Sequence, residues 1–154
     1  MEKRIKALGE GKGTADGLLV TISKAVNPTD EVKQKKLKDI GGALTGLGKD
    51  VGKEDSDIKS ARAAIQKLEQ RIKEKPLTSI TVEEIQGFDK EAKGIFSNVD
   101  GLKTEVTKSE DDLKRILAEL NALACKLNED RRNEAEKAYQ RALSHLDELK
   151  RKLH

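Results

Sequence analysis

The sequence predicts an all-α fold: an elongated antiparallel bundle of long amphipathic helices. Apolar residues recur at steps of three and four along most of the 154 residues, which is the spacing of one helix face. Aromatic residues make up 2% of the chain and charged residues 38%, so it can supply narrow apolar stripes but no thick core. Pro28 and Pro76 are the two prolines, and each separates two such stripes.

The longest stripe runs from Ile85 to Leu127 and keeps a period of about 3.5 residues. A helix of this length can bury its stripe only against partners of similar reach. We therefore expect residues 30–75 to fold back on residues 81–127, with Ser109 as a polar residue inside the stripe. Its apolar members are Ile85, Phe88, Ala92, Ile95, Val99, Leu102, Val106, Leu113, Ile116, Leu120, Leu123 and Leu127.

Three turns are predicted, near residues 28, 76 and 130. Thr29 or Asp30 is a suitable N-cap after the first turn. After Pro76, Thr81 and Glu84 have the spacing of a capping box, so a helix should start at 81 or 82. The third turn is expected because residues 128–134 contain no apolar residue and the stripe resumes out of phase at Ala135. A last helix would then run from 134 to the C-terminus.

Two interruptions are also expected inside the long segments. Five glycines between residues 41 and 52, followed by Asp55-Ser56-Asp57, predict a break or kink near 52–56. Ser109 and the three acidic residues after it could start a new helix, so we expect a shallow kink there. The first and last helices would pack along the outside of the central pair.

The chain reads as one helical bundle over residues 1–154, with a sub-boundary near 102–108. All twelve glycines and both prolines precede that point. Residues 109–154 are dominated by Ala, Glu, Lys, Leu and Arg, as in an idealised helical hairpin. An engineered or fused segment and a natural coiled-coil segment both fit this composition.

The glycine pattern is the most suggestive sequence feature. Small residues on two facing helices allow close backbone approach, and a fold about Pro28 would place Gly13 opposite Ala43. Two other interpretations stay open: a flexible N-terminal third, or a basic hairpin that opens onto a membrane surface. The candidate glycines are Gly9, Gly13, Gly17, Gly42 and Gly46.

Phe96 and Cys125 are the other candidate interaction residues. Phe96 lies beside the stripe rather than on it, so it is the aromatic expected to be an exposed anchor. Cys125 is the only cysteine, which excludes an internal disulfide. It lies on the outward side of a two-stranded coil, where it could form an intermolecular disulfide, although a bundle could equally bury it.

No residue pattern indicates catalysis, a cofactor or a metal. His145 and His154 are the two histidines, and neither forms a ligand pair with the other or with Cys125. The net charge of +3 is small and no basic face with aromatics is visible, which argues against nucleic-acid binding. No small-molecule substrate is indicated.

We therefore expect a non-enzymatic structural or protein-interaction bundle that binds another protein or itself through apolar helix faces. The alternative is reversible binding to membrane lipid through the glycine-rich N-terminal hairpin, because residues 1–52 carry the whole positive excess. No signal peptide or membrane-spanning stretch is visible, so the default expectation is a cytoplasmic protein.

Overall fold

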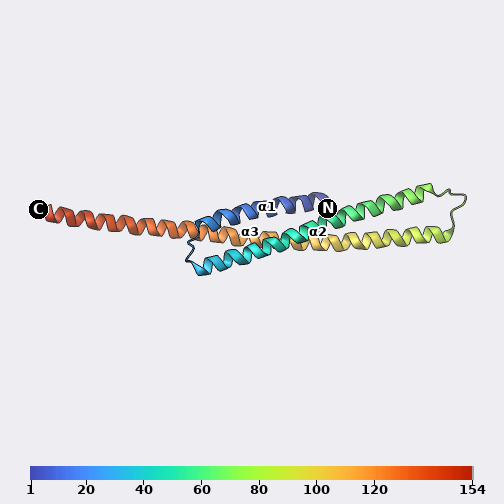
Figure 1. Ribbon diagram of the computed structural model, residues 1–154. Coiled ribbons are helices and arrows are strands. Elements are labelled where there is room, and N and C mark those ends of the chain that lie inside the picture. Colours follow the sequence, from blue (N-terminus) through green and yellow to red (C-terminus); the bar gives the residue numbers. More distant parts are fainter. Residues whose placement is uncertain (154) are drawn as a thin grey trace.

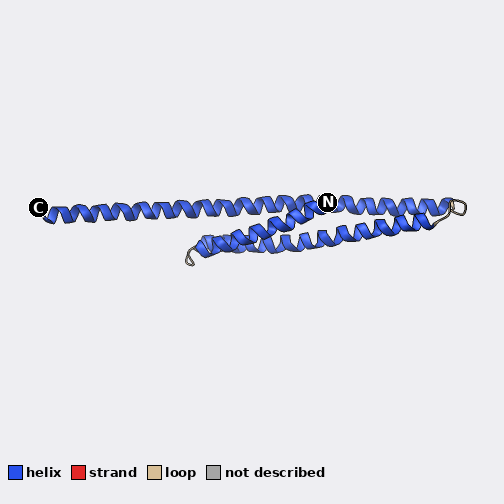
Figure 2. Ribbon diagram, turned by 90° about the horizontal axis from the view of Figure 1, so that it is seen from above, coloured by secondary structure: helices blue, strands red, loops and turns tan. Residues whose placement is uncertain are grey.

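The computed structural model describes residues 1–153 and contains three helices in that range (Figure 1). They are α1 (Glu2–Ala25), α2 (Glu31–Glu74) and α3 (Val82–Leu153). No strand occurs among these residues, as Figure 2 shows. The predicted all-α bundle is confirmed.

The helices divide the molecule lengthwise into three parts. In the three-helix body, α1 lies along the first part of α2 and the middle of α3. Beyond the N-terminus of α1, the far end of α2 and the start of α3 form a two-helix hairpin. At the opposite end, the C-terminal segment, residues 131–153 of α3, extends alone. As predicted, residues 31–74 fold back on the first part of α3.

α1 remains helical despite its glycines because both of its ends are held. Ile5 and Leu8 are buried near its start, and Ile22 near its end. Arg4 forms an ion pair with Glu110 of α3 and a hydrogen bond of 3.2 Å to the Thr107 hydroxyl. Tertiary contacts of this kind outweigh low helix propensity in long packed helices.

The loop between α1 and α2 is fixed to α3 by one lysine. The Asp30 carboxylate caps α2 by accepting a hydrogen bond from the Lys33 amide at 3.2 Å. The Lys33 ammonium also lies 3.1 Å from Asp30 and 2.9 Å from Asp130 of α3. This double ion pair marks the end of the three-helix body.

The predicted break in α2 near residues 52–56 is wrong, because α2 is continuous from Glu31 to Glu74. The three-and-four spacing continues through this region as Leu47, Val51, Glu54 and Ile58. The buried face therefore stays in phase across Gly52, and packing against α3 keeps the glycine helical.

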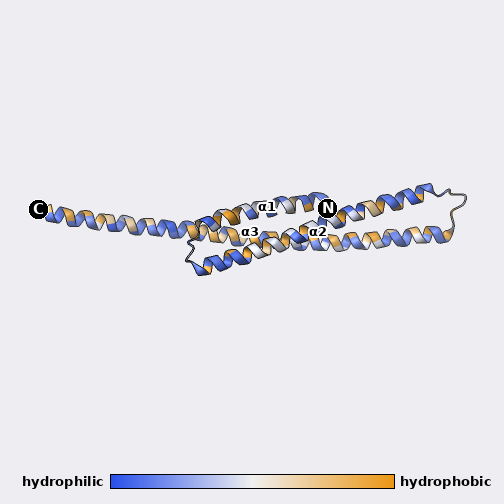
Figure 3. Ribbon diagram, viewed as in Figure 1, coloured by the Kyte–Doolittle hydropathy of each residue, from blue (hydrophilic) through white to orange (hydrophobic). Residues whose placement is uncertain are grey.

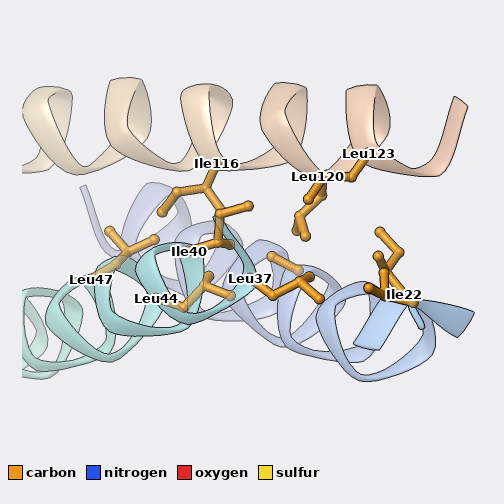
Figure 4. Packing of buried hydrophobic residues seen from close by; sticks show 10 residues of the cluster. Ile22, Leu37, Ile40, Leu44, Leu47, Ile116, Leu120 and Leu123 are labelled. Atoms are coloured by element: carbon orange, nitrogen blue, oxygen red, sulfur yellow. The ribbon is translucent and has the colours of Figure 1, made fainter. Parts of the chain in front are cut away.

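The core consists of two clusters of buried side chains. The larger cluster joins all three helices: in Figure 4, Ile22, Leu37 and Leu120 point toward one another. The smaller cluster joins the start of α1 to α3 further along the body. The larger cluster contains Ala15, Ile22, Val26, Leu37, Ile40, Leu44, Leu47, Ile116, Leu120 and Leu123, and the smaller one Ile5, Leu8, Leu102 and Val106.

The start of α3 agrees with the prediction. The helix begins at Val82, and the Thr81 hydroxyl accepts a hydrogen bond from the Glu84 amide at 3.1 Å. The Glu84 carboxylate forms an ion pair across the turn with Lys75, at 2.9 Å.

The predicted turn near residue 130 is wrong, and no separate last helix packs along the bundle. α3 continues from Val82 to Leu153 through both Ser109 and residues 128–134. No glycine or proline occurs after Gly101, so nothing local ends the helix. The loss of phase is instead a rotation: at 100° per residue, the apolar stripe from Ala135 to Leu153 lies about 80° around the axis from the Leu113–Leu127 stripe.

Candidate interaction surfaces

The hairpin carries an open apolar groove between α2 and α3, which we call the hairpin groove. Its lining is almost entirely apolar, and Phe96 stands at its edge with 69% of its surface exposed. The charged residues Glu69 and Lys73 border it on α2. Its other lining residues are Ile65, Leu68, Ile72, Ala92, Ile95 and Val99.

This groove continues the one that α1 fills in the body. Met1 lies against a surface lined by Ile58, Ile65 and Val99, and the last two residues also line the hairpin groove. Within the described residues, the groove is therefore covered by α1 over the body and open along the hairpin. α1 lies in the continuation of this groove over the body.

The hairpin is held by polar contacts at its outer end. The Arg71 guanidinium lies 5.4 Å from the centre of the Phe88 ring and forms an ion pair with Glu91 at 2.7 Å. These contacts orient α2 and α3 where the core is thinnest, since Leu68 is the only buried residue of α2 beyond Glu54.

The second open face runs along the C-terminal segment. Every residue from 131 to 153 is exposed, including Tyr139 (62%), Leu146 (47%) and Leu149 (58%). Figure 3 shows apolar residues recurring along this lone part of α3. A helix that is solvated on all sides gains nothing from such a stripe, and no other part of the described chain covers it. Its members are Ala135, Tyr139, Ala142, Leu146, Leu149 and Leu153.

A buried polar pair lies in the body near the smaller core cluster. Glu54 of α2 is 2% exposed, and its Oε1 accepts a hydrogen bond of 2.6 Å from the hydroxyl of Ser109, which is also buried. Its Oε2 is buried and accepts no hydrogen bond from the protein. The sequence identified Ser109 as a polar residue inside the apolar stripe; only the structure shows that it meets Glu54.

Burial raises the pKa of the Glu54 carboxyl above its ordinary value of 4.5, because desolvation disfavours the charged form. The Ser109 hydrogen bond opposes this shift, and the nearby charges of Asp50, Glu105 and Asp57 add to it. The pair can specify how α2 and α3 align, since a shift of either helix would leave a buried carboxylate unpaired. With no second titratable partner within hydrogen-bonding distance, it does not resemble a catalytic pair.

The candidate glycines do not make close contacts between helices. Gly9, Gly13, Gly17, Gly42 and Gly46 are all exposed, and a Cβ added to any of them would meet nothing within 4 Å. Close packing through these five residues is therefore wrong. Whether they contact another molecule stays a prediction.

Other glycines lie where the helices approach. A Cβ on Gly11 would fall 2.6 Å from Leu113 Cδ2, and one on Gly48 would fall 3.1 Å from Lys12 Cε. Gly48 opposite Lys12, and Gly41 beside Leu19, place α1 about one helical turn away from the alignment predicted by folding about Pro28. Sequence reasoning missed these positions because that stagger depends on packing rather than on loop length.

Cys125 is exposed on α3, on the outward side that its position predicted. Among residues 1–153, no three side chains of His, Cys, Asp or Glu type come together as metal ligands would. Within the same range, none of the helices combines the length and apolarity needed to cross a bilayer.

Comparison with known proteins adds no relative: no family model, no curated protein and no solved structure matches the chain.

Proposed function

We propose that this protein is a non-enzymatic interaction module that binds helices of a partner protein, or of a second copy of itself, through its open apolar faces. The observation that carries the proposal is the uncovered stripe on the C-terminal segment, where Leu146 and Leu149 stand in solvent on a lone helix. The hairpin groove supports it as a second open face that continues a helix-binding groove. The body would act as a rigid support that holds these faces apart.

The proposal separates residues that stabilise the fold from residues that bind. Ile40, Leu44 and Leu120 are buried among the three helices and stabilise the body. Phe96 and Leu146 contribute little burial within the monomer, so their replacement by a polar residue should leave the unfolding temperature nearly unchanged. Their apolar character is then explained by contact with another chain.

The test is the mass of the protein in solution, followed by light scattering from micromolar to millimolar concentration. Wild-type protein should exceed 17.0 kDa as concentration rises. Phe96→Glu should lower the mass if the groove is used, and Leu146→Glu if the C-terminal segment is used. Gln86→Glu and Ser144→Glu are matched controls, because they add the same charge on exposed positions outside the two apolar faces.

A mass of 17.0 kDa at every concentration would contradict the self-binding form of the proposal. Unfolding temperatures lowered strongly by Phe96→Glu and Leu146→Glu would contradict the division between folding and binding residues. Binding of the wild-type chain to anionic vesicles, with release of α1 from the body, would favour the lipid alternative instead.

A further inference from the structure

We infer that the C-terminal segment pairs with the same segment of a second copy in antiparallel orientation, about a twofold axis at the level of Ser144. The inference rests on the proposed function and names the partner of one of its two faces. The exposed stripe, the complementary sizes and charges along it, and the position of the body support this pairing.

The stripe has the spacing of a two-stranded coil, with Tyr139, Leu146 and Leu153 at positions a. Ala135, Ala142 and Leu149 then occupy positions d. This pattern extends over about two and a half heptads of continuous helix. The helix is already nucleated by the body, so pairing need not form it from a disordered chain.

Antiparallel pairing about Ser144 matches a large residue with a small one in two of the three kinds of layer. Leu146 meets Ala142 of the second copy, and Leu153 meets its Ala135. Tyr139 meets Leu149, and twofold symmetry repeats each pair. Leu143, which is 39% exposed, meets its own copy at the axis and widens the contact. The leucine–alanine layers pair unlike sizes and can pack without large voids.

Charge favours the same arrangement. Glu136 lies beside the stripe at one end and Lys150 at the other, so antiparallel pairing brings Glu136 next to Lys150 of the second copy, twice in the dimer. In a parallel pair, Glu136 would lie beside Arg131 of the second copy, but Lys150 would lie beside His145 of the second copy. Parallel pairing would also stack Tyr139 on Tyr139 and Ala142 on Ala142, which gives layers of very unequal size.

The body leaves room for this partner. The body ends at the Lys33–Asp130 ion pair, and the paired stretch begins at Ala135. The stripe is turned about 80° away from the face of α3 that holds α1 and α2, so neither helix covers it. The contact is a short one, at the low end of stable interfaces, and a reversible dimer is expected.

The single native cysteine provides a direct test of geometry. Cys125 is exposed and lies 19 residues before Ser144. In the antiparallel dimer, nitroxide labels on the two Cys125 residues should therefore lie about 57 Å apart along the helix axis. In a parallel dimer Cys125 would occupy position a of the same pattern, and the two labels would be in contact.

The second arm of the test is a charge exchange read out as dimer dissociation. Glu136→Lys alone should weaken the dimer of the full chain about tenfold, because two favourable pairs become repulsive. Lys150→Glu alone should do the same. The double variant should restore wild-type association, whereas Ser144→Glu, on the outward side, should change little.

A label distance near 57 Å together with rescue by the double variant supports the inference. Labels in contact, a loss without rescue, or no interaction between labels at millimolar protein would each overturn it. The outcomes also distinguish failure of the antiparallel dimer from failure of the proposed function. A chain whose mass rises with concentration and falls with Phe96→Glu, but not with Leu146→Glu, would retain an interaction role through the hairpin groove and lose the antiparallel dimer.

Discussion

The Glu54–Ser109 pair is a buried contact that can specify how α2 and α3 align and at the same time lower the stability of the folded protein. Glu54 carries a charge into an apolar interior, where only one of its oxygens has a partner. Replacing such a group with a neutral residue of the same shape removes the buried charge, while the remaining side-chain oxygen can still accept the Ser109 hydrogen bond. Ser109, predicted as a helix boundary or a tolerated polar residue, is the latter.

We predict that Glu54→Gln raises the free energy of unfolding near neutral pH by about 1–2 kcal/mol. The pKa of Glu54 is raised above 4.5 in the folded state, so folding is accompanied by proton uptake at pH values between 4.5 and the folded-state pKa. The contribution of Glu54 to stability therefore declines as pH rises through this window. The stability difference between variant and wild type, measured by urea unfolding, should grow with pH across it. A difference that is constant with pH, or a variant less stable at neutral pH, would contradict this assignment.

The exposed glycines give a second prediction at the residue scale. Gly13→Ala meets open space in α1 and should raise the free energy of unfolding by about 0.5–1 kcal/mol, because alanine loses less backbone freedom on folding. Gly11→Ala is the matched control, since its new methyl group would contact Leu113 and force that side chain to move. Thermal unfolding of the two variants compares them directly. A gain at Gly11 as large as that at Gly13 would show that Leu113 moves aside without cost.

At the scale of elements, α3 combines a packed helix with an unsupported one. Residues 102–127 contribute to both core clusters, whereas no residue from 131 to 153 is buried. Backbone hydrogen bonds of a lone exposed helix open more easily than those of a packed one.

Amide hydrogen exchange should therefore divide α3 in two. In dilute protein we expect amides of residues 131–153 to exchange much faster than those of residues 102–127. Raising the protein concentration should slow amide exchange of residues 135–153 and leave the exchange rates of the body unchanged. Equal protection along α3 in dilute protein would mean that the C-terminal segment is covered within the monomer.

Helix period, the first two turns and the caps at Asp30 and Thr81 could be predicted from sequence because they depend on local spacing and side-chain chemistry. The break near 52–56 and the turn near 130 were wrong for a shared reason. Glycine content and loss of stripe phase are weak local signals, and a helix continues through both when packing or composition permits. The loss of phase near residue 130 marks a shift of the apolar stripe to another face of the continuous helix rather than a turn.

The candidate surfaces were only partly predictable. Phe96 was expected to be exposed from its place beside the stripe, and it is. Predicting the hairpin groove requires the position at which α1 stops covering α2 and α3. That position depends on how far α1 is shifted along the other two helices, which the sequence alone does not determine. The Glu54–Ser109 contact likewise depends on the alignment of two helices far apart in the chain.

At the scale of the molecule, the structure is a rod whose two ends differ. α3 alone is about 108 Å long, and the body covers only its middle. Its open apolar faces lie at opposite ends of the rod, as the proposed binding of other helices requires.

Small-angle scattering as a function of concentration tests this account most directly, since it gives mass and length together. With antiparallel pairing over residues 135–153, we predict that the mass approaches twice 17.0 kDa while the longest dimension grows from about 110 Å to about 190 Å. A mass of 17.0 kDa and a length of about 110 Å at every concentration would contradict the account, as would a dimer no longer than the monomer.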